Sequence, residues 1–298
     1  MPAARAPLPM LSNAGARRAR APLERATSSD ELHDYVLWRY DPLAPPEGKL
    51  RSLNLLVESF ALAGLEDEGC ALVQKLREEL GPFRTVWGVK RHQGTGALAW
   101  ELYFYDWDRA HADLSIARLA EIFAPLVEVD AREPWPLPWH MVSVELGPEA
   151  LRARAKVPAH VYIDMLSYEL AGDRFTFENV YTFHDPRADV DQVLHRLRSS
   201  VHFDPKRDQV STLLPPALRR CHRVCVANKR RSDAVYASRI PTPALRWFLR
   251  THAWPDPLAA FVEAHGSDLD HLLWDVGLDF DREGGSIQVR KTGLYGSF

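Results

Sequence analysis

Thr85-Val-Trp-Gly-Val-Lys-Arg91 and Leu98-Ala-Trp-Glu-Leu-Tyr-Phe-Tyr-Asp106, with Gly94 and Gly96 between them, form the stretch that decides the fold of this chain. Both segments alternate residue by residue, which is the period of a β-strand. One face of the pair is bulky and apolar, and the other is charged, small or phenolic: Trp87, Val89, Trp100, Leu102 and Phe104 against Gly88, Lys90, Glu101, Tyr103 and Tyr105. The glycines mark a turn, so the stretch is predicted to be a β-hairpin with one apolar face.

The same alternation recurs along the chain and is interrupted by stretches with helical periodicity. Further strands are predicted at residues 140–145, 160–169, 174–183, 220–228, 234–240, 273–280 and 286–295. Helices are predicted at residues 50–80, split near Gly64, and at 114–126, 190–197, 243–249 and 258–272. Pairs of strands therefore alternate with amphipathic helices, which indicates an α+β protein.

Short connections between the strands favour an antiparallel sheet. If helices cover the apolar face, the polar and aromatic face must look inward or toward water. A sheet of about nine strands tends to curl, and closure removes its edges. We therefore expect an antiparallel β-barrel of about nine to ten strands surrounded by helices, with an interior suited to a ligand. Trp87 and Trp274 lie on the apolar face and are expected in the core.

Composition narrows the function classes. The chain has 298 residues, 46% of them hydrophobic and 26% charged, and a net charge of −3, so we expect neither a nucleic-acid nor a membrane partner. Three cysteines are too few for a disulfide framework, which favours a reducing, cytoplasmic location. We expect a monomer or weak dimer.

The first 27 residues differ in composition from the rest. They are rich in Ala, Arg and Pro and contain one acidic residue, Glu24. A disordered leader is the simpler interpretation, and an organelle transit peptide is the alternative. Residues 28–298 are predicted to form a single domain. Its start is placed at Ser28 because Ser28 and Glu31 have the spacing of a helix capping box.

Several later segments resemble the ABBA prenyltransferases, in particular the branch that modifies cyanobactin-type ribosomal peptides. The segment 234–240 after the polar turn 228–233, Trp274-Asp-Val-Gly277, and the C-terminal Gln288-Val-Arg-Lys-Thr-Gly-Leu-Tyr-Gly-Ser-Phe298 are similar to strands of that family. Ile163-Asp-Met165 and the position of Lys90 are weaker similarities. The family has the barrel described above.

The resemblance implies transfer of a prenyl group from an allylic diphosphate, such as dimethylallyl diphosphate, to a peptide side chain or an aromatic acceptor. Cationic groups, with Mg²⁺ as a possible cofactor, would hold the diphosphate, and aromatic faces would shield the allyl cation. The diphosphate candidates are Lys90, Arg239 and Lys291. The cation pocket candidates are Tyr103, Tyr105, Tyr181, Tyr236 and Tyr295, with Gly293 leaving room beside Tyr295.

Glu101 is the candidate catalytic base, because an apolar surround would raise its pKa. The equal alternative is a buried ion pair with Lys90 across the hairpin. The run Lys229-Arg-Arg231 favours a solvated turn over a phosphate site.

The first hairpin departs from the family. The family has a catalytic carboxylate where this chain has Val86 or Trp87, and an Arg where it has Glu101; Phe177-Glu-Asn-Val-Tyr181 also lacks an expected Lys and His. A non-catalytic barrel that binds a peptide or hydrophobic small molecule is therefore the second hypothesis. A surface-interaction protein with a filled barrel is the third.

Overall fold

The computed structural model describes residues 22–28, 30, 40–106 and 114–297, and its centre is a closed barrel of antiparallel strands. The strands follow one another around the barrel in the order β1-β12-β11-β10-β9-β8-β7-β6-β4-β2, and β2 pairs again with β1. The ten strands are β1 (Thr85–His92), β2 (Leu98–Tyr105), β4 (Met141–Leu146), β6 (Ala159–Ile163), β7 (Leu166–Ala171), β8 (Arg174–His184), β9 (Arg223–Lys229), β10 (Asp233–Pro241), β11 (Leu273–Glu283) and β12 (Ser286–Ser297). The predicted antiparallel barrel is confirmed.

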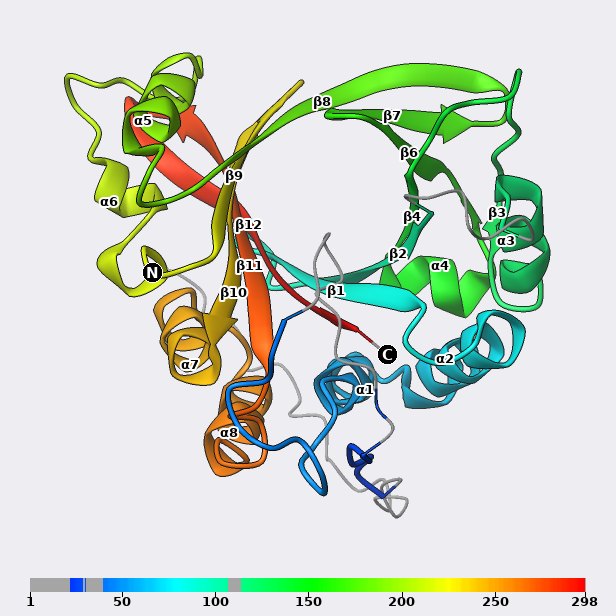
Figure 1. Ribbon diagram of the computed structural model, residues 1–298. Coiled ribbons are helices and arrows are strands. Elements are labelled where there is room, and N and C mark those ends of the chain that lie inside the picture. Colours follow the sequence, from blue (N-terminus) through cyan, green and yellow to red (C-terminus); the bar gives the residue numbers. More distant parts are fainter. Residues whose placement is uncertain (1–21, 29, 31–39, 107–113, 298) are drawn as a thin grey trace, which may run out of the picture.

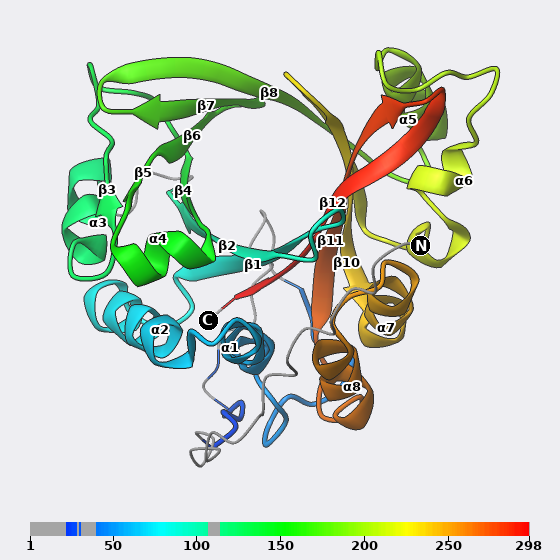
Figure 2. The same cartoon turned by 180° about the vertical axis from the view of Figure 1, so that it is seen from behind.

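The helices of the described residues lie outside the barrel (Figures 1 and 2). They are α1 (Leu53–Leu62), α2 (Glu66–Leu80), α3 (Ile116–Phe123), α4 (Pro148–Ala153), α5 (Val190–Arg198), α6 (Val210–Leu213), α7 (Thr242–Thr251) and α8 (Asp256–Ala264). A two-residue parallel pair, β3 (Glu128–Val129) with β5 (Lys156–Val157), lies beside α3 and α4. No helix in these ranges is long and apolar enough to cross a membrane.

The hydrophobic core lies between the barrel wall and the helices. Trp87, Trp100 and Trp274 point outward from their strands and are fully buried there. Trp100 packs on Phe60 of α1 with ring centroids 4.7 Å apart, and its indole N–H donates to Ser59 Oγ at 2.8 Å. The apolar face of the predicted hairpin therefore binds the helices, as expected.

Two predicted elements have wrong boundaries. Residues 160–169 form two strands, β6 and β7, because the chain reverses at Asp164, whose φ is +53°. The turn contains neither glycine nor proline, and Asp164, its one turn-favouring residue, was not interpreted as a turn. The helix predicted at 258–272 ends at Ala264, and a series of turns leads from it to β11.

The described part of the predicted leader belongs to the fold. Ala26 exchanges backbone hydrogen bonds with the segment Gly48–Lys49, and the Glu24 carboxylate contacts Arg51 and Arg77. The expectation of disorder is therefore wrong for residues 22–27, since Ala26 is buried and Glu24 is held by two guanidinium groups. Residues 1–21 and Glu31 of the proposed capping box lie outside the described residues.

Trp100 tests the position of the core. We expect W100A to lower the free energy of unfolding by about 3–5 kcal/mol, because it removes the ring that joins the barrel to α1. Chemical denaturation followed by circular dichroism measures this change. The matched control is F177A on β8, where the aromatic ring is 43% exposed and its loss should cost far less. Equal losses in the two variants would contradict this placement of the core.

Candidate functional site

The barrel interior has a charged end and an aromatic end. A cavity of about 410 Å³ at the first end, called the polar end below, is lined by charged side chains, among them Lys90, Glu101, Glu145, His160, Glu178, Lys229, Asp279 and Lys291. A second cavity of about 150 Å³, the aromatic chamber, is lined by residues that include Tyr105, His140, Met165, Phe183, Cys225 and Asp275. Tyr103, Tyr162, Tyr181 and Tyr236 line both cavities, so the cavities meet at these rings.

These four tyrosines and Tyr295 form what we call the tyrosine layer. Tyr295 contacts Tyr103 and Tyr236 with ring centroids 6.0 and 6.2 Å apart, and Tyr162 contacts Tyr181 at 5.9 Å. Burial raises the pKa of all five phenols, so they remain neutral near pH 7. Four of the five predicted pocket tyrosines therefore lie together, and Tyr105 lines the aromatic chamber beside them.

Glycines keep the interior open. Gly88 lies opposite Tyr295 on the neighbouring strand, and a Cβ at Gly88 would lie 2.7 Å from the Tyr295 ring. Gly277 stands in the same relation to Tyr236, where the distance would be 2.5 Å. The two rings thus lie flat over positions that carry no side chain. Gly293 leaves room for the Tyr295 hydroxyl, as the sequence predicted.

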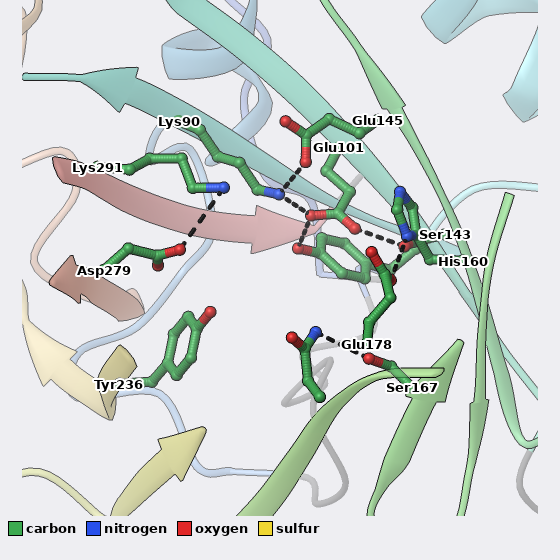
Figure 3. Close-up of polar contacts among 12 residues, drawn as sticks. Lys90, Glu101, Ser143, Glu145, His160, Ser167, Glu178, Tyr236, Asp279 and Lys291 are labelled. Atoms are coloured by element: carbon green, nitrogen blue, oxygen red, sulfur yellow. Dashed lines mark hydrogen bonds and ion pairs between the residues drawn. The ribbon is translucent and has the colours of Figure 1, made fainter. Parts of the chain in front are cut away.

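Lys90 and Glu101 form a buried ion pair at the polar end. Figure 3 shows the Lys90 ammonium directed at the carboxylates of both Glu101 and Glu145. Burial alone would lower the pKa of Lys90, but the two carboxylates raise it well above its usual value. Lys90 is therefore a permanent cation that holds two strands, β2 and β4, against β1.

The surroundings of Glu101 are polar rather than apolar. Its carboxylate accepts hydrogen bonds from the Tyr103 hydroxyl and the Ser143 hydroxyl in addition to the contact with Lys90. Burial would raise its pKa, but Lys90 outweighs burial and holds the pKa of Glu101 below its usual value. The expected upward shift is wrong, and the ion-pair alternative is confirmed.

Lys229 and Lys291 converge on Asp279 from the other side of the interior. Lys229 Nζ lies 2.7 Å from Asp279 Oδ2 and 3.1 Å from the Tyr236 hydroxyl, whereas Lys291 Nζ lies 3.7 Å from Asp279 Oδ2. The pKa of Lys291 is lowered, first by repulsion from the Lys90 ammonium and then by burial. The ammonium groups of Lys90 and Lys229 line the same cavity as Lys291, and their repulsion disfavours the charged form of Lys291.

Sequence analysis did not identify several residues of the polar end. Lys229 was predicted to lie in a solvated turn, but it is the last residue of β9 and its side chain is largely buried. Its signal was the strand period: Cys225, Ala227 and Lys229 alternate with outward-facing valines. Glu178 is the extra residue of a bulge in β8 and bonds His160 Nδ1 at 2.7 Å, which raises the pKa of His160 against the opposing effect of burial.

Arg239 lies apart from Lys90 and Lys291. Sequence analysis grouped it with the interior cations, but Arg239 is three residues from the inward-facing Tyr236, so strand alternation puts it on the other face. β10 also has a bulge between Ala237 and Ile240, where Arg239 adopts a φ of +56°. Its guanidinium lies over the Tyr40 ring, 5.7 Å from the centroid, and lines a different cavity next to Arg187 and Arg220. Arg239 is therefore separated from Lys90 and Lys291, with which sequence analysis grouped it.

The carboxylates of the polar end do not form a prepared metal site. Glu101, Glu145 and Asp279 each contact a lysine, and Glu178 contacts a histidine. In the part of the chain that the structure describes, no three His, Cys, Asp or Glu side chains are grouped so that they could hold a metal ion.

Comparison with known proteins leaves the function to be inferred from this geometry. No family model matches the chain, and no curated protein matches it significantly.

Lys90 provides a test of the buried charges. We expect K90M to lower the free energy of unfolding by about 3–5 kcal/mol near pH 7, because the buried Glu101 and the partly buried Glu145 would lose their cation. In the unsubstituted chain, the stability contributed by Glu101 is present above its ordinary pKa of 4.5 and is lost as the pH falls below it. In K90M, burial without the lysine should raise the pKa of Glu101. The difference in free energy of unfolding between the unsubstituted protein and K90M should therefore shrink toward pH 4.

Denaturant titrations at pH 7 and pH 4 measure the difference in free energy of unfolding between the unsubstituted protein and K90M. K156M is the matched control, since Lys156 pairs with Glu128 on the surface and its loss should change little. The same difference at pH 7 and pH 4 would contradict the charged state assigned to the pair Lys90–Glu101.

Gly88 provides a test of the tyrosine layer. We expect G88A to cost about 1–3 kcal/mol of stability, because its Cβ forces the Tyr295 ring from its place. G94A, in the hairpin turn where a Cβ meets nothing within 4 Å, should be close to neutral. Thermal unfolding of both variants measures the difference, and equal stabilities would show that Tyr295 does not depend on Gly88.

Proposed function

We propose that this chain transfers a prenyl group from an allylic diphosphate to a peptide side chain or an aromatic acceptor inside the barrel. The observation that carries the proposal is the order of groups along the interior: buried lysines, then the tyrosine layer, then an aromatic chamber. An allylic diphosphate has the same order, with a dianionic or trianionic head and an apolar tail. The resemblance of the last strands to ABBA prenyltransferases supports the same function.

In the proposed reaction, Lys229 and Lys291 bind the diphosphate. Lys291 contacts Asp279 at 3.7 Å, beyond hydrogen-bond length, and its pKa is lowered by the nearby Lys90, so an arriving anion would stabilise its charge. Arg230 and Arg231 line the same cavity. Lys90 was expected to bind the diphosphate, but it is engaged by two carboxylates. It would therefore contribute positive potential rather than a direct contact with the diphosphate.

The tyrosine layer suits an allyl cation. Neutral phenol faces attract a cation, and a layer of five rings excludes the water that would otherwise capture it. The raised pKa values matter here, because a phenolate would itself react with the cation. Lys229 donates a hydrogen bond to the Tyr236 hydroxyl. A diphosphate held by Lys229 would therefore lie next to an allyl cation that faces the Tyr236 ring.

The acceptor would reach the cation from the aromatic chamber. Two apolar side chains of this cavity, Met165 and Phe183, are each 37% exposed and mark where it meets solvent. A small aromatic ring or one side chain of a peptide matches a chamber of about 150 Å³.

A second candidate function is a barrel that binds a peptide or hydrophobic small molecule without catalysis. One observation favours it: each inward lysine already contacts a carboxylate, so the polar end is nearly neutral before any ligand binds. Such a protein would bind apolar ligands in the aromatic chamber and show no preference for a diphosphate.

Donor binding distinguishes the two functions. We expect the protein to bind dimethylallyl diphosphate, and K291A to weaken that binding by about tenfold or more, because a charge-assisted contact is lost. Isothermal titration calorimetry without an acceptor measures the affinity. R290A is the matched control: Arg290 neighbours Lys291 but points outward to Asp281 and Glu283.

An unchanged affinity in K291A removes this lysine from the site. Absence of binding for dimethylallyl, geranyl and farnesyl diphosphates alike would refute prenyl transfer and leave the second candidate. Turnover itself is measured by mass spectrometry of a peptide library incubated with the three donors.

A further inference from the structure

Prenyl transfer requires a group that takes the proton of the acceptor, and the carboxylates of the barrel interior fall into two sets. Glu101, Glu145, Glu169, Glu178 and Asp279 line the polar end, on the side where the diphosphate would leave. The aromatic chamber, where the acceptor would lie, is lined by Asp275 and Asp164. A base has to be within hydrogen-bond reach of the proton it takes, so position decides between the two sets.

Glu101 is in the wrong place for this task. It lines the polar end and does not line the aromatic chamber, and Tyr103, which donates a hydrogen bond to it, stands between them. Lys90 and Ser143 engage its carboxylate as well. A carboxylate stabilised by so many donors is a weak proton acceptor.

Asp275 is in the right place. It is on β11 between the outward-facing Trp274 and Val276, so its side chain points into the interior, and the residue is 7% exposed. It pairs directly with Tyr295 on β12 and therefore borders the ring on which the allyl cation would lie. The other carboxylate of the chamber, Asp164, is an exposed residue of the β6–β7 turn.

The bulge in β10 accounts for how Asp275 is held. At Arg239 the backbone adopts a φ of +56°, and its N–H donates to Asp275 Oδ1 at 2.7 Å. A regular strand would have directed this N–H into the ladder. Bulges and left-handed residues other than glycine are concentrated next to active sites, because they redirect groups at a cost in strain. Arg239 thus serves the site through its backbone, as a positioning residue.

We propose that Asp275 is the catalytic base of the acceptor side, an inference that rests on the proposed prenyl transfer. The bond between the allylic carbon and the diphosphate oxygen breaks, and the diphosphate leaves with the electron pair. The nucleophilic atom of the acceptor forms a bond to the allylic carbon, and its proton passes to a carboxylate oxygen of Asp275. Leaving group and base stand at opposite ends of the tyrosine layer, so the proton and the diphosphate depart in opposite directions.

The test separates donor chemistry from acceptor chemistry. D275N keeps the oxygen that accepts from Arg239 N–H and removes the basicity, so the bulge should persist. With dimethylallyl diphosphate and a mixture of short peptides containing Tyr, Trp, Ser, Thr or Cys, three quantities are measured: donor affinity, diphosphate release without acceptor, and prenylated peptide. We expect D275N to lose peptide prenylation by about 100-fold or more while the first two quantities stay within about threefold. D281N is the matched control and should retain all three, because Asp281 is on the same strand but lines neither cavity and bonds Arg290 outside the barrel.

Four outcomes would overturn the assignment. Prenylation by D275N at close to the unsubstituted rate removes Asp275 from proton transfer. A parallel loss of donor affinity and diphosphate release, with circular dichroism unchanged, makes its role structural rather than catalytic. A selective loss in H140Q but not in D275N transfers the role to His140, which also lines the chamber. If the unsubstituted protein binds no isoprenoid diphosphate, the proposed function fails first, and the role of Asp275 fails with it.

Discussion

Closing a ten-stranded sheet encloses one of its faces, and the pairing of charges on that face is the constraint on which the rest of the structure depends. The outward face meets helices and is filled by tryptophan, leucine and phenylalanine, as in any two-layer protein. The inward face carries lysines and carboxylates that have left bulk water, so each must find a partner nearby. Lys90 between Glu101 and Glu145, and Asp279 between Lys229 and Lys291, meet this requirement through partners on the adjacent strand or the next strand but one.

The pairing also divides the interior along its axis. Charges collect at one end, where ammonium groups approach closely enough to lower the pKa of Lys291. Beyond them the tyrosine layer begins, and glycines at positions 88, 277 and 293 let two of its rings lie against the wall instead of filling the interior. An elongated ligand with an anionic head and an apolar tail matches this polarity, and Asp275 adds a carboxylate at the far, aromatic end. The proposed reaction follows from that order rather than from any single residue.

Much of the architecture was predictable from residue periods. Trp87 and Val89 alternate with Gly88 and Lys90, and this alternation correctly assigned the helix-facing and interior-facing sides of the first hairpin. The same reasoning failed where the backbone leaves the regular strand. Asp164 and Arg239 adopt positive φ values without glycine, so their turn and bulge lack the strongest sequence signal for this conformation. The turn at Asp164 split a predicted strand. Arg239 was wrongly grouped with the interior cations, since it is three residues from the inward-facing Tyr236 and lines a different cavity.

The sequence by itself determined which residues are apolar on one face and polar on the other, because strand periodicity is a local property of the chain. The barrel, the helices that cover it and the tyrosines of its interior could therefore be predicted from the sequence. Only the tertiary structure decided which interior charges meet. Glu101 was open to two interpretations until Lys90, Tyr103 and Ser143 were found around it. Lys229 was assigned to a solvated turn, and Asp275 had no assigned role, until strands far apart in the chain placed them in the cavities. The physical reason is that a carboxylate's pKa and role depend on neighbours contributed by other strands, which no local pattern specifies.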